Sequence, residues 1–340
     1  MERELSVSFL MALMASALGV LATYRMAIRF KILDIPNKRS SHIRPTPRGG
    51  GIGILFGVLI TILFYRLNKN YVLPGWPFWI GLALVAGIGL LDDILGYVKP
   101  IIRIALQVGA ALLIAISFGY FKYLPFPPPF DISLGSFGFV LTLLWFVAVM
   151  NFFNFMDGID GIAGLQALIT GATIAFATRG SQAWLGSVIA GASLGFLFFN
   201  WQPAKIFMGD VGSYSLSFLL ASAPFISETK SSYSLTMLIG LSLWMFLADA
   251  TFTIVRRLVT GERIWEAHRS HLYQRLVQTG LPHYRVTMLV GISSVVISAL
   301  GVYAYTGHAT LRWWATFFVA VALFLGEMML TVHRERTKRA

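Results

Sequence analysis

Long apolar runs alternate with short polar connections along the whole chain. The runs lie at about 7–28, 49–65, 77–91, 101–120, 137–153, 162–178, 183–199, 213–226, 234–255, 286–304 and 312–332. A helix needs about 20 mostly apolar residues to cross a bilayer. The pattern therefore predicts an all-α polytopic membrane protein with about eleven transmembrane helices, or ten if a short run such as 213–226 does not cross.

Composition narrows the class of protein further. Hydrophobic residues make up 56% of the 340 residues and charged residues only 12%, whereas a soluble domain carries roughly a quarter charged residues. A water-soluble globule, a disordered chain and a collagen-like fibre are excluded. With so many predicted spans, we expect residues 1–340 to form a single integral membrane domain. The chain has no cysteine, which excludes thiolate catalysis and cysteine-bound metals.

The charge distribution predicts an orientation. The net charge is +12, and about 20 of the 27 lysines and arginines fall on connections that share one side of the membrane. Basic residues gather on the cytoplasmic side of membrane proteins. We therefore expect the N-terminus outside and the C-terminus inside, and we attribute the basicity to this rule and to an anionic substrate rather than to nucleic acid.

Five polar clusters all fall on the predicted cytoplasmic side, which favours a site at that face. The first is the turn-rich segment DIPNKRSSHIRPTPRGGG at 34–51. Its Arg44 and Arg48 are suited to hold phosphates, and its glycines let backbone approach a ligand closely. The alternative is a basic loop that touches lipid headgroups.

The second cluster, LLDDILGYVKPIIR at 90–103, places two carboxylates at the end of a span. Asp92 and Asp93 could hold Mg²⁺, act as a base or orient a basic side chain. Lys99 and Arg103 follow within two helical turns and could bind phosphate. The alternative is a salt-bridge group at a helix end that faces water.

The third cluster is NFFNFMDGIDGIAG at 151–164. Asn151, Asn154 and Asp157 are three residues apart and share one side of a helix, and Asp160 continues the spacing after a glycine. Oxygen-bearing side chains on one face suit a hard cation. The alternative is polar contact between helices.

The fourth cluster is FNWQPAKIFMGDVGS at 199–213. Asp210 lies between two glycines and is presented on a turn, Phe207 could stack on a base, and Lys205 could meet a phosphate. The alternative is an ordinary turn that contains an aspartate.

The fifth cluster is the connection at about 256–285, with EAHRSHLYQRL at 266–276. His268 and His271 are three apart, with Arg269 between them, and the basic context favours phosphate or sugar contacts over zinc. The alternative is an amphipathic helix at the membrane surface. Together the five clusters suit phosphoryl transfer between a nucleotide-type donor and a lipid acceptor.

At this point the chain resembles the polyprenyl-phosphate N-acetylhexosamine-1-phosphate transferases, a glycosyltransferase 4-like family. It includes phospho-N-acetylmuramoyl-pentapeptide transferase and the initiating transferases of O-antigen and enterobacterial common antigen. NFMDGIDG and FMGDVGS carry the resemblance most specifically, with PTPRGGG and the pair Asp92-Asp93 in support. It extends from Asp34 to about Arg275. PNKRSSHIRPTPRGGG and HRSHLYQR are most similar to the O-antigen-initiating branch.

The resemblance implies a reaction in the bacterial inner membrane, with the active site facing the cytoplasm. The phosphate of undecaprenyl phosphate attacks the β-phosphorus of a UDP-N-acetylamino sugar such as UDP-GlcNAc, which releases UMP and starts a surface glycan. Mg²⁺ is required, and Mn²⁺ could replace it. A homodimer is compatible with the family.

The resemblance also implies roles for individual residues. Asn154 and Asp210 match the metal positions, and Asp92 and Asp93 match the catalytic pair. The substrate-binding set is Arg44, Arg48, Lys99, Arg103, Asp157, Asp160, Asn200, Lys205, Phe207, His268, Arg269 and His271. Among these, Phe207 matches an aromatic that stacks on uracil, with Asn200 and Asp160 near the nucleotide.

The chain departs from the family pattern at two places. A third acidic residue often follows the aspartate pair by four positions, where this chain has Gly96, and the histidine element has only two histidines. Asp93 is expected to serve either as a base or as a positioning group, with equal weight, because a phosphate monoester with a second pKa of about 6 is already mostly dianionic at neutral pH.

Two other functions are weaker interpretations of the sequence. A transporter for a nucleotide sugar or another anion would carry charged residues near the midplane and inverted repeats. A membrane prenyltransferase would carry paired DxxxD-type segments. Neither pattern is present in the sequence.

Overall fold

A computed structural model describes residues 2–36, 44–67, 74–226, 232–263, 268–307 and 309–339. Within these ranges the chain forms thirteen helices and one pair of two-residue strands. The elements are α1 (Glu2–Arg29), β1 (Leu33–Asp34), β2 (Thr46–Pro47), α2 (Gly50–Leu67), α3 (Trp76–Leu95), α4 (Pro100–Phe118), α5 (Phe137–Met156), α6 (Ile162–Ala177), α7 (Gly180–Asn200), α8 (Asp210–Ser222), α9 (Ser232–Ser242), α10 (Trp244–Val259), α11 (Leu272–Gln278), α12 (His283–Gly307) and α13 (Thr310–Arg339).

Every predicted apolar run contains a helix, and the all-helical membrane fold is confirmed. In the described ranges, eight helices are long and apolar enough to cross a membrane, and a ninth span results if α9 and α10 are counted together. The run at 234–255 is not one straight helix, because α9 and α10 are bent by 74° at Leu243. Helices α6 and α8 have 16 and 13 residues, which is shorter than the roughly 20 that a full crossing needs.

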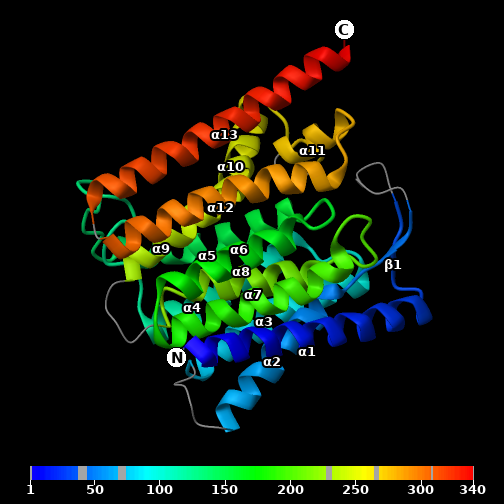
Figure 1. Cartoon of the computed structure of the whole chain (residues 1–340), viewed down its shortest axis with the longest axis horizontal. Coiled ribbons are helices and arrows are strands. Elements are labelled where there is room, and N and C mark those ends of the chain that lie inside the picture. Colours follow the sequence, from blue (N-terminus) through cyan, green and yellow to red (C-terminus); the bar gives the residue numbers. More distant parts are fainter. Residues whose placement is uncertain are drawn as a thin grey trace.

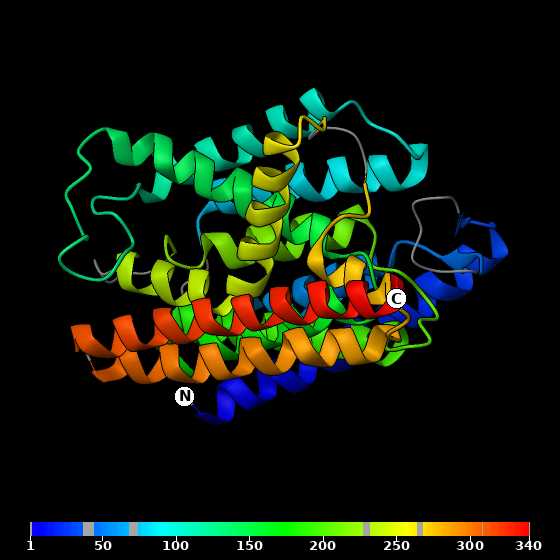
Figure 2. The same cartoon turned by 90° about the horizontal axis from the view of Figure 1, so that it is seen from above.

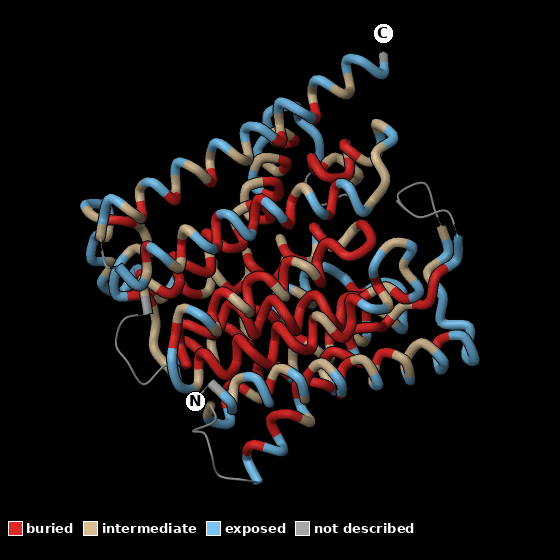
Figure 3. The backbone as a smooth tube through the Cα atoms, viewed as in Figure 1, coloured by how far each residue is buried: buried red, intermediate tan, exposed pale blue. Residues whose placement is uncertain are grey.

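The two short helices lie inside the bundle rather than at its edge. Figures 1 and 2 show α1 and α13 on the outside, with α7 and α8 enclosed between the other helices. Every residue of α8 is buried, and the buried backbone in Figure 3 is concentrated over α6, α7 and α8. Because α8 touches protein on all sides, it does not need the length of a helix that faces lipid.

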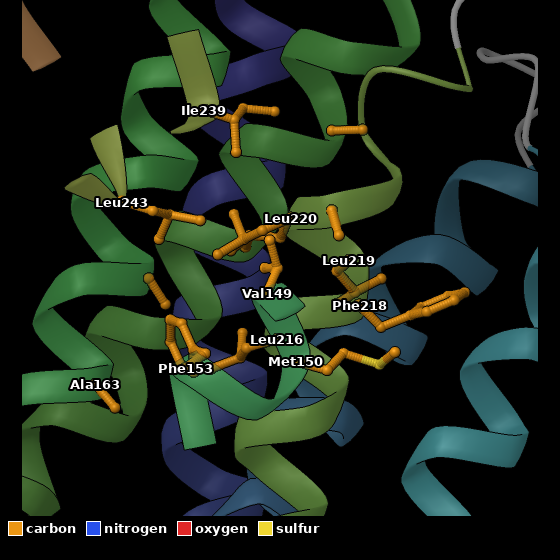
Figure 4. Packing of buried hydrophobic residues seen from close by; sticks show 14 of the residues in the cluster. Val149, Met150, Phe153, Ala163, Leu216, Phe218, Leu219, Leu220, Ile239 and Leu243 are labelled. Atoms are coloured by element: carbon orange, nitrogen blue, oxygen red, sulfur yellow. The ribbon is translucent and has the colours of Figure 1, made fainter. Parts of the chain in front are cut away.

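The core fixes the end of α5 against the start of α8. Figure 4 shows Val149, Met150 and Phe153 of α5 among Leu216 and Phe218 of α8, and all five are buried. Dispersion contacts of this kind hold helices together where lipid removes the hydrophobic driving force. This packing places the polar C-terminal end of α5 beside the N-terminus of α8.

A short backbone ladder joins two distant loops at that same end. The amide of Phe207 donates to the carbonyl of Pro47 (2.8 Å), and the amide of Gly50 donates to the carbonyl of Phe207 (2.8 Å). The glycine-rich start of α2 is thereby held beside the FMGDVGS turn, so clusters that are about 160 residues apart meet in space.

Candidate active site

The carboxylate of Asp93 caps the N-terminus of α8. Its Oδ1 accepts the amide hydrogen of Asp210 (2.9 Å) and its Oδ2 accepts that of Val211 (3.1 Å). Amides in the first turn of a helix have no partner within the helix, and a negative charge there is stabilising. Gly209 precedes this turn at φ 77°, and a Cβ at Gly209 would clash with the carboxylate of Asp93. The turn therefore needs glycine at this position.

Two arginines lie within ion-pair distance of Asp210 and of the neighbouring pair Asp92 and Asp93. Arg48 Nε lies 2.8 Å from Asp93 Oδ1, and Arg48 Nη2 lies 3.2 Å from Asp210 Oδ1. Arg103 Nη1 lies 3.6 Å from Asp210 Oδ2 and 3.8 Å from Asp92 Oδ2. We call Asp92, Asp93, Asp210, Arg48 and Arg103 the carboxylate cluster. Three carboxylates and two guanidinium groups from four separate segments thus meet within ion-pair distance.

Asp92 also has a local structural task. It is buried, and its Oδ1 accepts the amide hydrogen of Val98 at 2.6 Å. The bond closes the turn between α3 and α4, where Gly96 adopts φ 73°. Asp92 thus stabilises the turn that places Arg103 beside the carboxylate cluster.

Asn154 and Asp210 lie side by side. Asn154 Nδ2 donates to Asp210 Oδ1 (3.1 Å) and to Ser213 Oγ (2.8 Å). Asp157 follows at the end of α5, where burial and the nearby Asp210 carboxylate raise its pKa to about 7 although Arg48 acts in the opposite direction. Asp157 therefore belongs to the same electrostatic environment as the carboxylate cluster.

These donors fit a hard divalent cation. Mg²⁺ is usually held by one or two carboxylates, with substrate phosphates and water completing its shell. Asp210 supplies a carboxylate, Asn154 has a side-chain carbonyl, and Asp157 lies nearby. In the described part of the chain, no three His, Cys, Asp or Glu side chains converge as a metal-binding group. A cation at Asn154 and Asp210 would therefore keep open coordination positions for ligands from outside the protein.

The histidine segment is organised by Asp249, which sequence reasoning missed. Asp249 lies in α10, is 1% exposed, and accepts the amide hydrogens of Leu272 (2.9 Å) and Tyr273 (3.2 Å). Its Oδ1 also lies 3.3 Å from His271 Nδ1. The signal was present in the sequence, since an acidic residue inside an apolar run is costly unless it has a task.

A second contact brings the histidines toward α5. The hydroxyl of Tyr273 donates to the carbonyl of Phe155 at 2.9 Å, and Phe155 lies two residues before Asp157. The rings of His268 and His271 are 5.1 Å apart. Burial, with repulsion from His271, lowers the pKa of His268 to about 4, so this imidazole is neutral at physiological pH.

Two residues predicted near the nucleotide are bonded to the protein itself. Asn200 Oδ1 accepts the amide hydrogen of Gly161 (2.9 Å), and Asn200 Nδ2 donates to the carbonyl of Ile206 (2.9 Å). Asp160 Oδ2 accepts the amide hydrogen of Ala204 (3.1 Å). These side chains tie the NFMDGIDG and FMGDVGS loops together, so the structure assigns them a positioning task.

The remaining predicted residues lie on the same loops and helix ends in the sequence. Phe207 is half-buried and pairs through its backbone with the strand that leads to Arg48. Lys99, Lys205 and Arg44 are exposed, and Arg269 is half-buried. Residues 37–43 of the first cluster and 264–267 of the fifth lie outside the described residues.

Comparison with known proteins tests the resemblance. The model of glycosyl transferase family 4 matches residues 76–228, a range that contains the aspartate pair and both loop motifs. A probable undecaprenyl-phosphate N-acetylglucosaminyl 1-phosphate transferase of Bacillus subtilis is 31% identical, over 86% of this chain and 85% of its own length. The chain belongs to glycosyl transferase family 4. The resemblance is confirmed, and the enzyme is a sugar-1-phosphate transferase that acts on polyprenyl phosphate.

Other relatives show how broadly this transferase resembles its family. A decaprenyl-phosphate N-acetylglucosaminephosphotransferase of Mycobacterium leprae is 31% identical, over 78% of this chain and 75% of its own length. A phospho-N-acetylmuramoyl-pentapeptide-transferase of Bacillus subtilis is 26% identical, over 87% of this chain and 95% of its own length. Relatives named for different sugars thus align with most of the transferase.

Proposed function

We propose that this transferase moves an N-acetylamino-sugar 1-phosphate from a UDP-sugar to undecaprenyl phosphate. The reaction forms a lipid-linked sugar pyrophosphate and releases UMP. The observation that carries the proposal is the carboxylate cluster, in which Asp210 lies beside Asn154 and between Arg48 and Arg103. A pyrophosphate donor and a phosphate acceptor repel each other, and such a cluster can hold a cation and both anions.

Charge neutralisation is the main chemical task of the site. Asn154 and Asp210 would hold Mg²⁺, which supplies charge neutralisation at the donor pyrophosphate. Arg48 and Arg103 would bind the remaining phosphate oxygens. Lys99, Lys205 and Arg44 are exposed near these loops and would attract both anions.

The transfer step needs little proton movement. An oxygen of the acceptor phosphate bonds to the β-phosphorus, the bond from that phosphorus to the bridging oxygen breaks, and UMP leaves with the electron pair. The acceptor is mostly dianionic at neutral pH because its second pKa is about 6. Since both carboxylate oxygens of Asp93 accept backbone hydrogens from α8, we propose that Asp93 is a positioning residue rather than a base.

An apolar cavity offers a place for the lipid tail. It has a volume of about 560 Å³ and lies along α10, with lining residues that include Trp145, Trp244, Leu247, Phe252 and Phe324. We call it the tail cavity. A polyisoprenoid chain is apolar and insoluble, and aromatic and aliphatic walls suit it.

The orientation is part of the proposal. We place the N-terminus outside, the C-terminus in the cytoplasm and the carboxylate cluster at the cytoplasmic face of a bacterial inner membrane. Lysines and arginines support this side. The short helices α6 and α8 would complete eleven crossings, because protein surrounds them and the bilayer need not match their length.

The donor sugar and the glycan are finer parts of the proposal. UDP-N-acetylglucosamine is the first donor to test, since the names of two relatives specify N-acetylglucosamine. A related UDP-N-acetyl-deoxyhexosamine is the second. Similarity of PNKRSSHIRPTPRGGG and HRSHLYQR to the O-antigen-initiating branch supports initiation of a surface polysaccharide. A homodimer is also proposed, to be tested by mass in detergent.

The deciding experiment measures UMP release. Purified protein is incubated with undecaprenyl phosphate, Mg²⁺ and one UDP-amino sugar at a time. We expect stoichiometric UMP and lipid-linked sugar pyrophosphate with at least one donor, and neither product without the acceptor. Absence of UMP with every donor, from protein that is folded and monodisperse, would overturn the proposal.

A further inference from the structure

A second pocket lies between α10, α11 and α13. It has a volume of about 550 Å³. We call it the basic pocket. Its lining residues are Phe252, Arg256, Arg275, Met328, Met329, Val332, His333 and Arg336. None of them belongs to the carboxylate cluster or to the predicted substrate-binding set.

The lining contains three arginines and a histidine but no acidic residue. Arg275 is already neutralised, because its Nε and Nη2 each lie 2.8 Å from a carboxylate oxygen of Glu335. Arg256 makes no ion pair among the described residues, although Glu262 and Glu335 are near enough to act on its charge. Its Nη2 donates to the carbonyl of Ser270 (3.1 Å), and its buried Nε has no hydrogen-bond partner among the described residues. A buried N–H without a partner is costly, so the pocket is suited to an incoming anion.

The other wall of the pocket is apolar. Phe252, Met328, Met329 and Val332 line it, and Phe252 also lines the tail cavity. Along α13, the apolar residues end at this level and the basic segment HRERTKR begins. An arginine pocket with an apolar wall, at the end of a span, matches the depth at which a lipid phosphate lies.

We propose that the basic pocket binds the phosphate headgroup of an anionic membrane phospholipid, with its acyl chains against the apolar wall. Arg256 and Arg336 would bind the phosphate, while Arg275 remains with Glu335. Basic pockets between helices at the cytoplasmic side recognise such headgroups. A soluble anion would gain nothing from the apolar wall, which favours a lipid as the occupant.

The bond from Arg256 to Ser270 links this pocket to the histidine segment. A headgroup that fixes the guanidinium of Arg256 also fixes the carbonyl of Ser270, which lies one residue before His271. Lipid binding would thereby order the loop that faces α5. The binding proposal itself does not depend on the transfer reaction.

The test is lipid titration followed by native mass spectrometry of the full chain in detergent. The variant is Arg256→Gln/Arg336→Gln, and the matched control is Arg285→Gln/Arg334→Gln, which removes the same charge outside the pocket. We expect one phosphatidylglycerol bound to wild type and control, with affinity roughly tenfold lower in the pocket variant, since both guanidinium groups that would contact the phosphate are removed. Phosphatidylcholine with the same chains should bind at least tenfold more weakly to the wild type.

Four outcomes would overturn the proposal. These are equal losses in both double variants, equal binding of phosphatidylcholine, displacement of the lipid by millimolar glycerol 3-phosphate, or preferential retention of undecaprenyl phosphate in the pocket. The last two would identify a soluble anion or the acceptor as the occupant. If the double variant does not fold, Arg336→Gln alone changes an exposed residue and should still weaken phosphatidylglycerol binding several-fold.

Discussion

Asp210 is the residue on which the contacts of the site converge. Arg48 and Asn154 contact its Oδ1, and Arg103 contacts its Oδ2. Removing one partner from a buried charged group leaves the others without compensation, which costs more than the lost bonds themselves. Changes at Asp210 should therefore affect both the chemistry and the local structure.

The first prediction concerns Asp210→Ala. UMP formation should fall below detection at any Mg²⁺ concentration, because the proposed metal ligand and the partner of both arginines are lost together. The measurement is a Mg²⁺ titration of UMP release. Asp131→Ala, in the loop before α5, is the control and should titrate like the wild type; a normal Mg²⁺ response of Asp210→Ala would refute the metal assignment.

The second prediction separates the two roles of Asp93. Asp93→Asn keeps the shape but loses the charge that caps α8 and pairs with Arg48, so kcat should drop roughly 10- to 100-fold. If Asp93 only positions these groups, the drop is the same at every pH from 6 to 9. Recovery of kcat at high pH, where the acceptor is fully ionised, would instead establish the base.

The third prediction concerns His268, whose folded pKa of about 4 lies below the usual value of about 6.5. Between these two values the unfolded chain binds a proton that the folded chain does not, so stability falls as pH drops from 7 toward 4. Thermal unfolding should show a smaller loss of Tm from pH 7 to pH 5 in His268→Gln than in the wild type. Equal losses of Tm in His268→Gln and the wild type would contradict the assignment.

For single residues, the sequence shows which polar side chains are unusual, but it does not show which groups they contact. The unusual position of Asp92, Asp93 and Asp210 at helix ends is visible in the sequence, because charge there is costly. The partners are not, since Asp93 and Asp210 are 117 residues apart and only packing brings them together. Asn200 and Asp160 show the same limit: their motifs are recognisable, but their bonds to Gly161 and Ala204 are not.

Among the elements, α8 determines the geometry of the site. Its N-terminus carries Asp210 and is capped by Asp93, and α3 passes so close that a Cβ at Gly89 would lie 2.5 Å from the carbonyl oxygen of Asp210. Close approach of this kind between helices requires the smallest side chain. The distance between α3 and α8 therefore sets where the carboxylates stand.

The fourth prediction uses two glycines on α3. Gly89→Ala should push α3 away from the start of α8, lower Tm and reduce kcat by roughly tenfold or more, because misplacement of about 1 Å costs that much or more in catalysis. Gly87→Ala meets no atom within 4 Å and is the matched control. The measurements are UMP release and thermal unfolding; equal behaviour of the two variants would show that this contact does not set the geometry.

Helix positions were predictable from the sequence, whereas their shapes were not. Runs of apolar residues predict where helices lie because lipid demands satisfied backbone hydrogen bonds. The bend of 74° between α9 and α10 follows Gly240 and Ser242, a pairing that can weaken a helix, but no proline marks the break and the apolar run continues through it. The short length of α8 likewise reflects complete enclosure by other helices, which depends on tertiary packing.

For the whole molecule, the connections at one end carry the chemistry. The turn between α3 and α4, the end of α5, the start of α8 and α11 all meet there, while the termini lie toward different ends (Figure 2). Charge counting predicted this gathering, although it could not measure distances. Cysteine labelling can test on which side of the membrane this end of the protein lies.

The fifth prediction exploits the absence of cysteine from the chain. Single cysteines at the exposed positions Lys99 and Lys205 should react with an impermeant maleimide only after the inner membrane is permeabilised. A cysteine at Tyr123, in the connection from α4 to α5, should react in intact spheroplasts. The reverse labelling pattern would show the opposite orientation. Labelling of the cysteines at positions 99 and 205 from opposite sides of the membrane would contradict the proposed site.

Arg48 and Arg103 have a consequence for the order of binding. In the structure each guanidinium serves as a resident counter-ion for Asp210. If the carboxylate of Asp210 binds a cation, both arginines lose that ion-pair partner and become available to the phosphates of the donor. Asp210 would then pair with the cation and the two arginines with the phosphates, so that no buried charge is left without a counter-ion. We therefore expect the metal and the nucleotide sugar to enter as one complex, and neither to bind tightly without the other.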